Sequence, residues 1–210
     1  MRPVPVGALL DRGLGRARIA LERTVAVLCW KCREATEGVR CAGCGALQHP
    51  PARADLFEVL ELKRSYHLDR EVLDSAWRAR SRLTHPDRFA GASAVERRMA
   101  MQWTATLNEA RLILRNPVSR AWYLATGSGR PPESAGPSLS PDFLEEIFDL
   151  RMQAMEEPES VRARVEAIKA ELDAEIDSIF LAWEEGRGDL SAVPERLSRL
   201  KYVDNLLREL

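Results

Sequence analysis

The spacing of apolar residues predicts a helical protein. From residue 54 onward they recur every three or four positions, as on one face of an α-helix. The first helical segment is DLFEVLEL (55–62), which Asp55 can cap. The second begins at the potential cap Asp69, and the third covers about 92–115, where an Asn-Pro pair ends it. We expect the second and third segments to form an antiparallel hairpin whose connecting loop is exposed at its tip.

The second segment has a basic side and an apolar side. Arg78 and Arg82 lie on the basic side, which on its own is typical of a solvated helix face. The predicted core positions on the other side are Val72, Leu73, Ala76, Trp77 and Leu83, with Arg80 at the margin.

A second helical region follows a stretch rich in Gly, Pro and Ser (127–141), which indicates a linker. Ser140 and Pro141 suit the cap and the first position of the next helix. Helical segments are predicted at about 141–156, 158–185 and 190–210. The turns between them are short, so neighbouring helices should run antiparallel in a three-helix bundle.

The first helix of this bundle carries two apolar stripes, separated by roughly 120° at about 100° per residue. Either both stripes are buried in the core, or one of them is an exposed binding surface. On the third helix, Tyr202 and Leu206 also lie off the predicted core stripe. The two stripes are Phe143, Ile147, Leu150 and Ala154 on one side and Leu144, Phe148, Met152 and Met155 on the other.

Four cysteines lie close together in the motifs CWKC (29–32) and CAGC (41–44). Each C-x2-C turn can direct two sulfurs at one point, and two turns supply the four thiolates that a structural zinc ion requires. Gly43 and Gly45 suit such a tight backbone, and the metal would supply folding energy that so short a segment lacks. Two disulfides or a redox C-x-x-C pair are the alternatives. The predicted ligands are Cys29, Cys32, Cys41 and Cys44.

The tripeptide HPD (85–87) follows the second helical segment. Pro86 disfavours a helical conformation at His85, so the helix should end there. A helix stop explains these two residues but gives no role to Asp87. A catalytic acid–base pair is possible, yet no nucleophile, glycine-rich phosphate loop or set of pocket-forming strands accompanies it.

Composition and charge exclude some functions. The chain has 210 residues, of which 45% are apolar and 30% charged, enough for a globular core. A net charge of −1 provides no general attraction to nucleic acid or anionic lipid, and no apolar run approaches the ~20 residues that span a bilayer. Residues 1–28 suggest a bacterial extension of a cytoplasmic protein. The alternative is a transit peptide leading to the mitochondrial matrix.

Several motifs together resemble a J domain, and more narrowly the HscB type of J-protein, a co-chaperone of iron–sulfur cluster assembly. They are DLFEVLEL, the basic second helix, HPDRFA and LNEARLILRNPVSRAWYLATG, of which PVSRAWYL is particularly similar to HscB. Some eukaryotic members carry a double C-x2-C module before the J domain, similar to CWKC and CAGC here. The resemblance covers residues 29–126 well and the remainder more loosely.

The resemblance implies that the HPD loop docks on an ATPase chaperone of the DnaK/HscA class and stimulates its ATP hydrolysis. Physical considerations agree, because Pro86 stiffens the loop and Asp87 offers a carboxylate to an arginine of the partner. A basic face would steer the encounter toward an acidic groove. The predicted chaperone-binding residues are His85, Pro86, Asp87, Arg78, Arg82 and Arg88.

The resemblance also implies a client surface for an IscU-type iron–sulfur scaffold protein on the bundle. Leu144, Phe148 and Tyr202 match the apolar contact positions of the family, whereas Glu145 stands where the bacterial pattern often has an apolar residue. A J-domain protein with a different client is the alternative, and a zinc-dependent or redox enzyme is a third hypothesis.

The expected fold is all-α, with a helical-hairpin J domain, a C-terminal three-helix bundle and a small four-cysteine zinc module. We expect a non-enzyme with structural zinc, without nucleic-acid or membrane partners. The predicted parts are an extension (1–28), the zinc module (29–46), the J domain (54–126), the linker (127–141) and the client-binding bundle (142–210).

Overall fold

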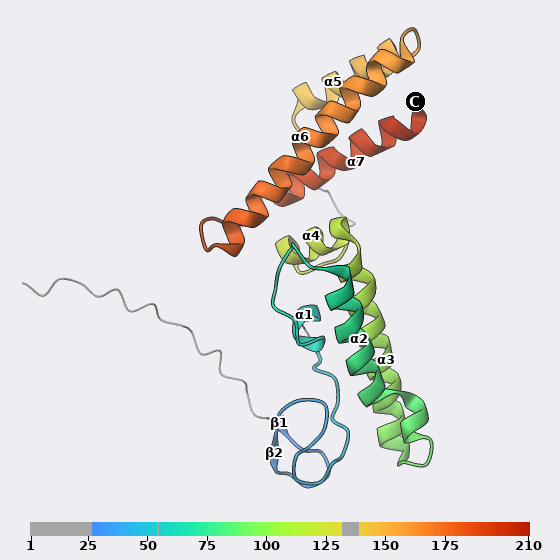
Figure 1. The fold of residues 1–210 in the computed structure, drawn as a ribbon, viewed down its shortest axis with the longest axis vertical. Coiled ribbons are helices and arrows are strands. Elements are labelled where there is room, and N and C mark those ends of the chain that lie inside the picture. Colours follow the sequence, from blue (N-terminus) through green and yellow to red (C-terminus); the bar gives the residue numbers. More distant parts are fainter. Residues whose placement is uncertain (1–26, 54, 132–138) are drawn as a thin grey trace, which may run out of the picture.

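The computed structural model describes residues 27–53, 55–131 and 139–210, and it is mostly helical over these ranges (Figure 1). The predicted extension therefore lies almost wholly outside the described residues, as do residues 132–138 of the predicted linker. The first described residues form a short antiparallel ladder of β1 (Val27–Leu28) with β2 (Ala35–Thr36), in which Val27 pairs with Thr36. The all-helical fold class with a small cysteine module is confirmed.

A helical hairpin follows, made of α2 (Arg70–Thr84) and α3 (Ala94–Arg115), with the short helix α1 (Leu56–Val59) packed against α3. The predicted caps are in place. The Asp55 and Asp69 carboxylates accept backbone N–H bonds at the starts of α1 and α2. Ser93 and Glu96 form a reciprocal capping box at the start of α3.

The core of the hairpin is narrower on α2 than the sequence pattern predicts. Val72 and Leu83 are 51% and 42% exposed, so their assignment to the core is wrong. Leu73 is the one apolar residue of α2 that is fully buried. Arg80 takes an inner position instead, because its Nε donates to the carbonyl of Val59 at 3.0 Å and its guanidinium lies over the Trp103 ring.

One further helix, α4 (Pro117–Thr126), joins the hairpin to the rest of the chain. The side chain of Asn116 caps it by accepting the backbone N–H of Ser119, and Pro117 occupies its first turn. It ends at Gly127, whose φ of 77° is the left-handed conformation that glycine adopts readily. Because α4 packs on both α3 and α7, it connects the hairpin to the C-terminal bundle.

The bundle consists of α5 (Pro141–Ala154), α6 (Pro158–Glu184) and α7 (Val193–Glu209) (Figure 1). Ser140 caps α5 as predicted, accepting the backbone N–H of Phe143. The prediction that Leu206 lies off the core of α7 is wrong, since it is 1% exposed. The reason is that α7 contacts α4, α5 and α6, so it needs a wider buried face than a single stripe.

The hairpin and the bundle meet at a contact that we call the junction, formed by Ser65, Tyr66 and His67 with Phe180 and Glu184 of α6. The Tyr66 and Phe180 rings stack with centroids 4.1 Å apart. One oxygen of the Glu184 carboxylate accepts bonds from the Ser65 hydroxyl and from the backbone N–H groups of Tyr66 and His67. These interactions fix the two helical units against each other.

Candidate docking surfaces and metal site

The HPD residues lie in a tight turn between α2 and α3. His85 is extended (φ −58°, ψ 132°) and ends α2, and Pro86–Phe89 then form a single 3-10 turn. We call residues 85–89 the docking turn. Its tip is accessible, because the side chains of His85 and Asp87 are 55% and 89% exposed. Its base is fixed, because Phe89 is 3% exposed within the core.

The interactions inside the docking turn are local. The Nδ1 atom of His85 accepts the backbone N–H of Asp87 at 3.3 Å and lies 3.5 Å from its carboxylate. Both side chains nevertheless remain more than half exposed to solvent. The turn therefore offers a ring nitrogen and an anionic group in a fixed relation.

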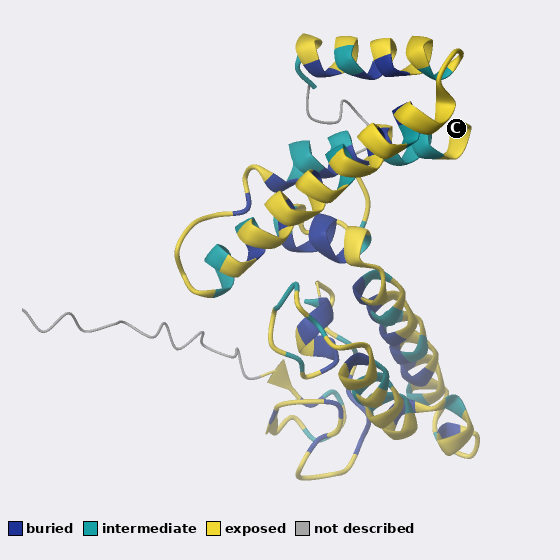
Figure 2. Cartoon of the chain, turned by 45° about the horizontal axis from the view of Figure 1, so that its top comes forward, coloured by how far each residue is buried: buried dark blue, intermediate teal, exposed yellow. Residues whose placement is uncertain are grey.

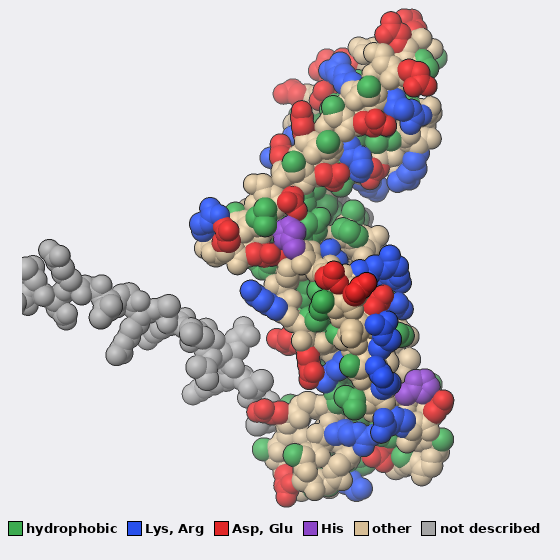
Figure 3. Space-filling view, in the orientation of Figure 1, with side chains coloured by type: hydrophobic (Ala, Val, Ile, Leu, Met, Phe, Trp, Pro, Cys, Tyr) green, Lys and Arg blue, Asp and Glu red, His purple; other side chains and the backbone are tan. Residues whose placement is uncertain are grey.

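Of the three predicted arginines, Arg88 lies within the docking turn and Arg78 and Arg82 lie on α2, which precedes it. The Nε of Arg82 donates to the carbonyl of Arg78, and Nη1 of Arg88 donates to the carbonyl of Arg82 at 3.1 Å. All three residues are exposed. Figure 3 shows Lys and Arg side chains gathered along α2. The six residues predicted for chaperone binding thus form a set that runs from the docking turn along α2 to Arg78, near the middle of that helix.

The four predicted ligand cysteines form a single cluster. Their sulfur atoms all lie within 4.8 Å of one another, and the Cys29–Cys44 and Cys32–Cys41 sulfurs are 3.6 Å apart. A tetrahedron with Zn–S bonds of about 2.3 Å has edges of about 3.8 Å. All four cysteines are free thiols in the structure, so the geometry favours a site for a metal ion over the alternative of two disulfides.

Two similar backbone turns carry these cysteines. In the first, the N–H of Arg33 bonds the carbonyl of Cys29, and in the second the N–H of Gly45 bonds the carbonyl of Cys41. Arg33 and Gly45 occupy equivalent positions, with φ angles of 68° and 71°. The second turn uses glycine for this left-handed conformation, as predicted, whereas the first places an arginine there at some conformational cost.

The amides of these turns favour thiolates. The backbone N–H of Cys32, followed by that of Lys31, lowers the pKa of Cys29 to about 6 despite its burial. The backbone N–H groups of Cys44 and Gly43 similarly lower the pKa of Cys41. The Glu34 amide also favours the Cys32 thiolate, but burial and the neighbouring sulfurs raise its pKa to about 12. Sulfurs crowded in this way suit a cation that neutralises several thiolates at once, so the cluster could hold a metal ion.

The two apolar stripes of α5 have different environments. Figure 2 shows that α5 turns a buried side toward the bundle and an exposed side away from it. The hypothesis that both stripes are core is therefore wrong. We call the outer set the exposed stripe; it consists of Leu144, Phe148, Met152 and Met155, with exposures of 43%, 61%, 52% and 79%.

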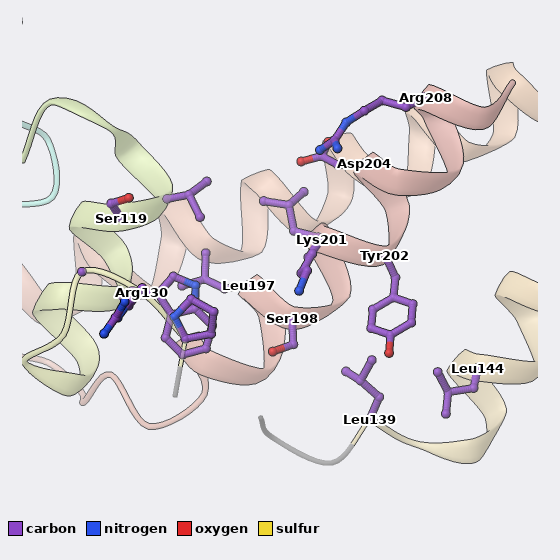
Figure 4. Close-up of a pocket in the computed structure, with 15 residues that line it drawn as sticks. Ser119, Arg130, Leu139, Leu144, Leu197, Ser198, Lys201, Tyr202, Asp204 and Arg208 are labelled. Atoms are coloured by element: carbon purple, nitrogen blue, oxygen red, sulfur yellow. The ribbon is translucent and has the colours of Figure 1, made fainter. Parts of the chain in front are cut away.

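A cavity of about 780 Å³ lies beside this stripe, between α4, α5 and α7. Leu144 and Tyr202 line it together, and Figure 4 shows the two side chains side by side. Tyr202 is 40% exposed, as predicted. Phe148, the third residue predicted for client binding, is not among the lining residues and lies one turn further along α5.

Within the described ranges, none of the helices has the length and apolar character that a membrane span requires.

An exposed HPD turn on a helical hairpin, a four-cysteine cluster and a helical bundle with an apolar outer stripe together define a J-protein. Residues 139–210 match the model of a family described as the HSCB C-terminal oligomerisation domain. The chain is 32% identical over 170 residues to the co-chaperone protein HscB homolog of Bordetella avium, covering 76% of this chain and 96% of that relative. The chain belongs to the HscB family of co-chaperones.

Three further matches cover most of the chain. The iron-sulfur cluster co-chaperone protein HscB of Mus musculus is 28% identical over 214 residues, with 97% of this chain and 89% of the relative covered. The crystal structure of the human co-chaperone protein HscB matches with a TM-score of 0.67 at 27% identity, covering 86% of this chain and 95% of that one. HscB from Vibrio cholerae matches with a TM-score of 0.52 at 27% identity, covering 74% and 94%.

Proposed function

We propose that the chain acts in iron–sulfur cluster assembly by docking on a DnaK/HscA-class ATPase chaperone and stimulating its ATP hydrolysis. The observation that carries this proposal is the docking turn, an exposed His85–Asp87 pair on a rigid base. The Asp87 carboxylate is 89% exposed and can accept a bidentate arginine of the chaperone. The rigid turn loses little conformational freedom on binding. The name of the mouse relative supports the link to iron–sulfur clusters.

Steady-state ATPase measurements on the chaperone test this role. The wild-type chain should raise the rate, and His85→Gln should lose most of the stimulation because it removes the imidazole from the tip of the turn. The matched control is His49→Gln, the same change at an exposed histidine of residues 27–53, which we call the cysteine-bearing segment. If His85→Gln stimulates as well as the control, the docking role is refuted.

We propose that an IscU-type scaffold protein binds the exposed stripe together with Tyr202. Exposed apolar patches of this kind commonly mark protein-binding sites. Leu144 and Tyr202 supply adjacent apolar surface from two helices, and Phe148 extends it along α5. This surface is separated from the docking turn by the length of the hairpin, so both partners could bind at the same time (Figure 1).

The double substitution Phe148→Ala with Tyr202→Ala tests the client surface. Removing two aromatic contacts should weaken scaffold binding by more than about tenfold and change the melting temperature little, because both side chains are exposed. Leu181→Ala, at a 47% exposed leucine of α6, is the control. Unchanged affinity in a folded double variant would place the client elsewhere on the chain.

We propose that the cysteine cluster holds one structural zinc ion and that the protein itself catalyses no reaction. Four thiolates fill a tetrahedral site and leave no position for a substrate. Metal analysis of the purified chain should find one zinc, and Cys41→Ser should release it while α2–α7 stay folded. A metal-free protein with four oxidised thiols would contradict this. The proposal also includes the predicted division into a zinc module (29–46), a J domain (54–126) and a client-binding bundle (142–210). It further includes a cytoplasmic location or, as the alternative, the mitochondrial matrix.

A further inference from the structure

An arginine of the cysteine-bearing segment contacts the docking turn. The guanidinium carbon of Arg40 lies 5.0 Å from the centroid of the Phe89 ring. Phe89 is the last residue of the 3-10 turn that contains Pro86 and Asp87. Arg40 itself is exposed, so its guanidinium covers the outer side of a ring that is otherwise buried.

This contact is held by a shared core. Val39 and Leu47 belong to the same buried cluster as Phe89 and Trp103, although they flank a cysteine turn. The Nε1 atom of Trp103 donates to the carbonyl of Gln48 at 2.8 Å, which ties this strand-like segment to α3. The segment around Arg40 is therefore packed against the hairpin rather than tethered loosely to it.

The position of Arg40 depends on the cysteine cluster. Arg40 directly precedes Cys41, and its Nη1 donates to the carbonyl of Gly45, which directly follows Cys44. Its backbone pairs with Leu47 in an isolated bridge across the same turn. On the other side, Nε2 of Gln48 donates to the sulfur of Cys29 at 3.4 Å. A change in the separation of the sulfurs would thus move the groups that orient Arg40.

We propose that Arg40 is a positioning residue that couples metal occupancy of the cysteine cluster to the order of the docking turn. When the metal holds the four thiolates together, the second cysteine turn is closed and Arg40 stacks on Phe89. When the metal leaves, the second cysteine turn opens and Arg40 moves away from Phe89. Residues 85–89 then lose the contact that covers the Phe89 ring at the base of the docking turn. The consequence for a chaperone rests on the proposed function, but the coupling itself is a property of the isolated chain.

Amide hydrogen exchange measured by NMR tests the coupling without any partner. The N–H groups of Arg88 and Ala90 bond the carbonyls of His85 and Asp87, so their exchange reports the order of the turn. In the zinc-loaded wild-type chain, a chelator should speed their exchange by about threefold or more, as expected when a weak contact is lost. Arg40→Ala should show fast exchange with zinc still bound, and chelation should then add little.

The control is Arg53→Ala, which removes the same charge from an exposed arginine outside both cysteine turns. It should exchange like wild type in both states, with the same zinc content. The proposal is overturned if chelation leaves exchange at Arg88 and Ala90 unchanged in the wild type. It is also overturned if zinc-loaded Arg40→Ala exchanges at the wild-type rate.

An ATPase titration then tests the consequence for docking. Arg40→Ala should raise the concentration that gives half-maximal stimulation by about threefold and leave the maximal rate unchanged, because His85 and Asp87 are intact. Arg40→Lys, which keeps a cation over the ring, should recover part of the loss. If the wild type gives no stimulation, the proposed function fails while the exchange result still decides the coupling. A lowered maximal rate with normal exchange would contradict a positioning role.

Discussion

The two ends of the helical hairpin differ in how their polar groups are used. At the junction, one carboxylate oxygen of Glu184 accepts three hydrogen bonds, and the Tyr66 ring stacks on Phe180. At the docking turn, His85 and Asp87 interact mainly with each other and face solvent. At the junction the polar groups of the hairpin bind the bundle, whereas at the docking turn they remain available to a partner. We expect substitutions at the junction to change stability and those at the turn to change function.

The largest expected effect is on function alone. Asp87→Asn removes the charge of a carboxylate that is 89% exposed, so it should reduce chaperone ATPase stimulation by at least about tenfold. The melting temperature should stay at the wild-type value, since no buried contact is lost. Paired ATPase and thermal melting measurements would check both parts. A melting temperature of Asp87→Asn well below that of the wild type would show that the docking turn also stabilises the fold. The contrast between the docking turn and the junction would then not hold.

The opposite pattern is expected at the junction. Glu184→Ala leaves the Ser65 hydroxyl and two backbone N–H groups without their acceptor, which should lower the free energy of unfolding by about 1–3 kcal/mol. Stimulation of the chaperone should persist at temperatures where the variant is folded. Chemical denaturation is the measurement, with Glu171→Ala, at an exposed position of α6, as the control. Equal stability of the two variants would mean that the junction contributes little.

The smallest expected effect is a pH dependence of the junction. Burial lowers the pKa of His67, but its hydrogen bonds to Asp177 and Glu184 and their charges outweigh this and raise it above the ordinary value of 6.5. Burial raises the pKa of Glu184, yet the bonds from Ser65 and His67 lower it below the ordinary value of 4.5. The His67 contribution is complete below pH 6.5 and lost as pH rises through the raised pKa. The Glu184 contribution is complete above pH 4.5 and lost as pH falls through the lowered one.

The junction should therefore be most stable between pH 4.5 and 6.5. As the pH rises from 6 to 8, the melting temperature of the wild type should fall by up to about 2 °C more than that of His67→Gln. The difference is small because the His67 ring is partly exposed and the chain is long. Parallel melting curves over this range, with His49→Gln as the control, measure the difference. Identical slopes for wild type and His67→Gln would show that the bonds of His67 to Asp177 and Glu184 are not coupled to folding.

Features encoded by neighbouring residues could be predicted from the sequence. Asp55, Asp69 and Ser140 were identified as caps because a helix start depends on a few adjacent positions. The cysteine cluster and the exposure of the docking turn follow equally from local spacing. For the same reason the exposed stripe of α5 was visible as a pattern, but which stripe is buried depends on where α6 and α7 lie.

Features that depend on packing between distant segments could not be predicted. Val72 and Leu83 fit the apolar periodicity of α2, but none of the helices in the described part of the chain covers that side of it. Leu206 was placed off the core because the contact of α7 with α4 is not visible in a local pattern. The junction joins residues more than a hundred positions apart, and its segment 63–68 has no helical periodicity that would mark it.

The central claim is that the docking turn and the client surface act at the same time from separate places. Native mass spectrometry of the purified chain with a DnaK/HscA-class chaperone, ATP and an IscU-type scaffold tests it most directly. The account predicts that the wild-type chain forms one assembly that contains all three proteins. The Asp87→Asn variant should form only the complex with the scaffold, and the Phe148→Ala, Tyr202→Ala double variant should form only the complex with the chaperone. Detection of only pairwise complexes with the wild type, in which the scaffold displaces the chaperone, would contradict it.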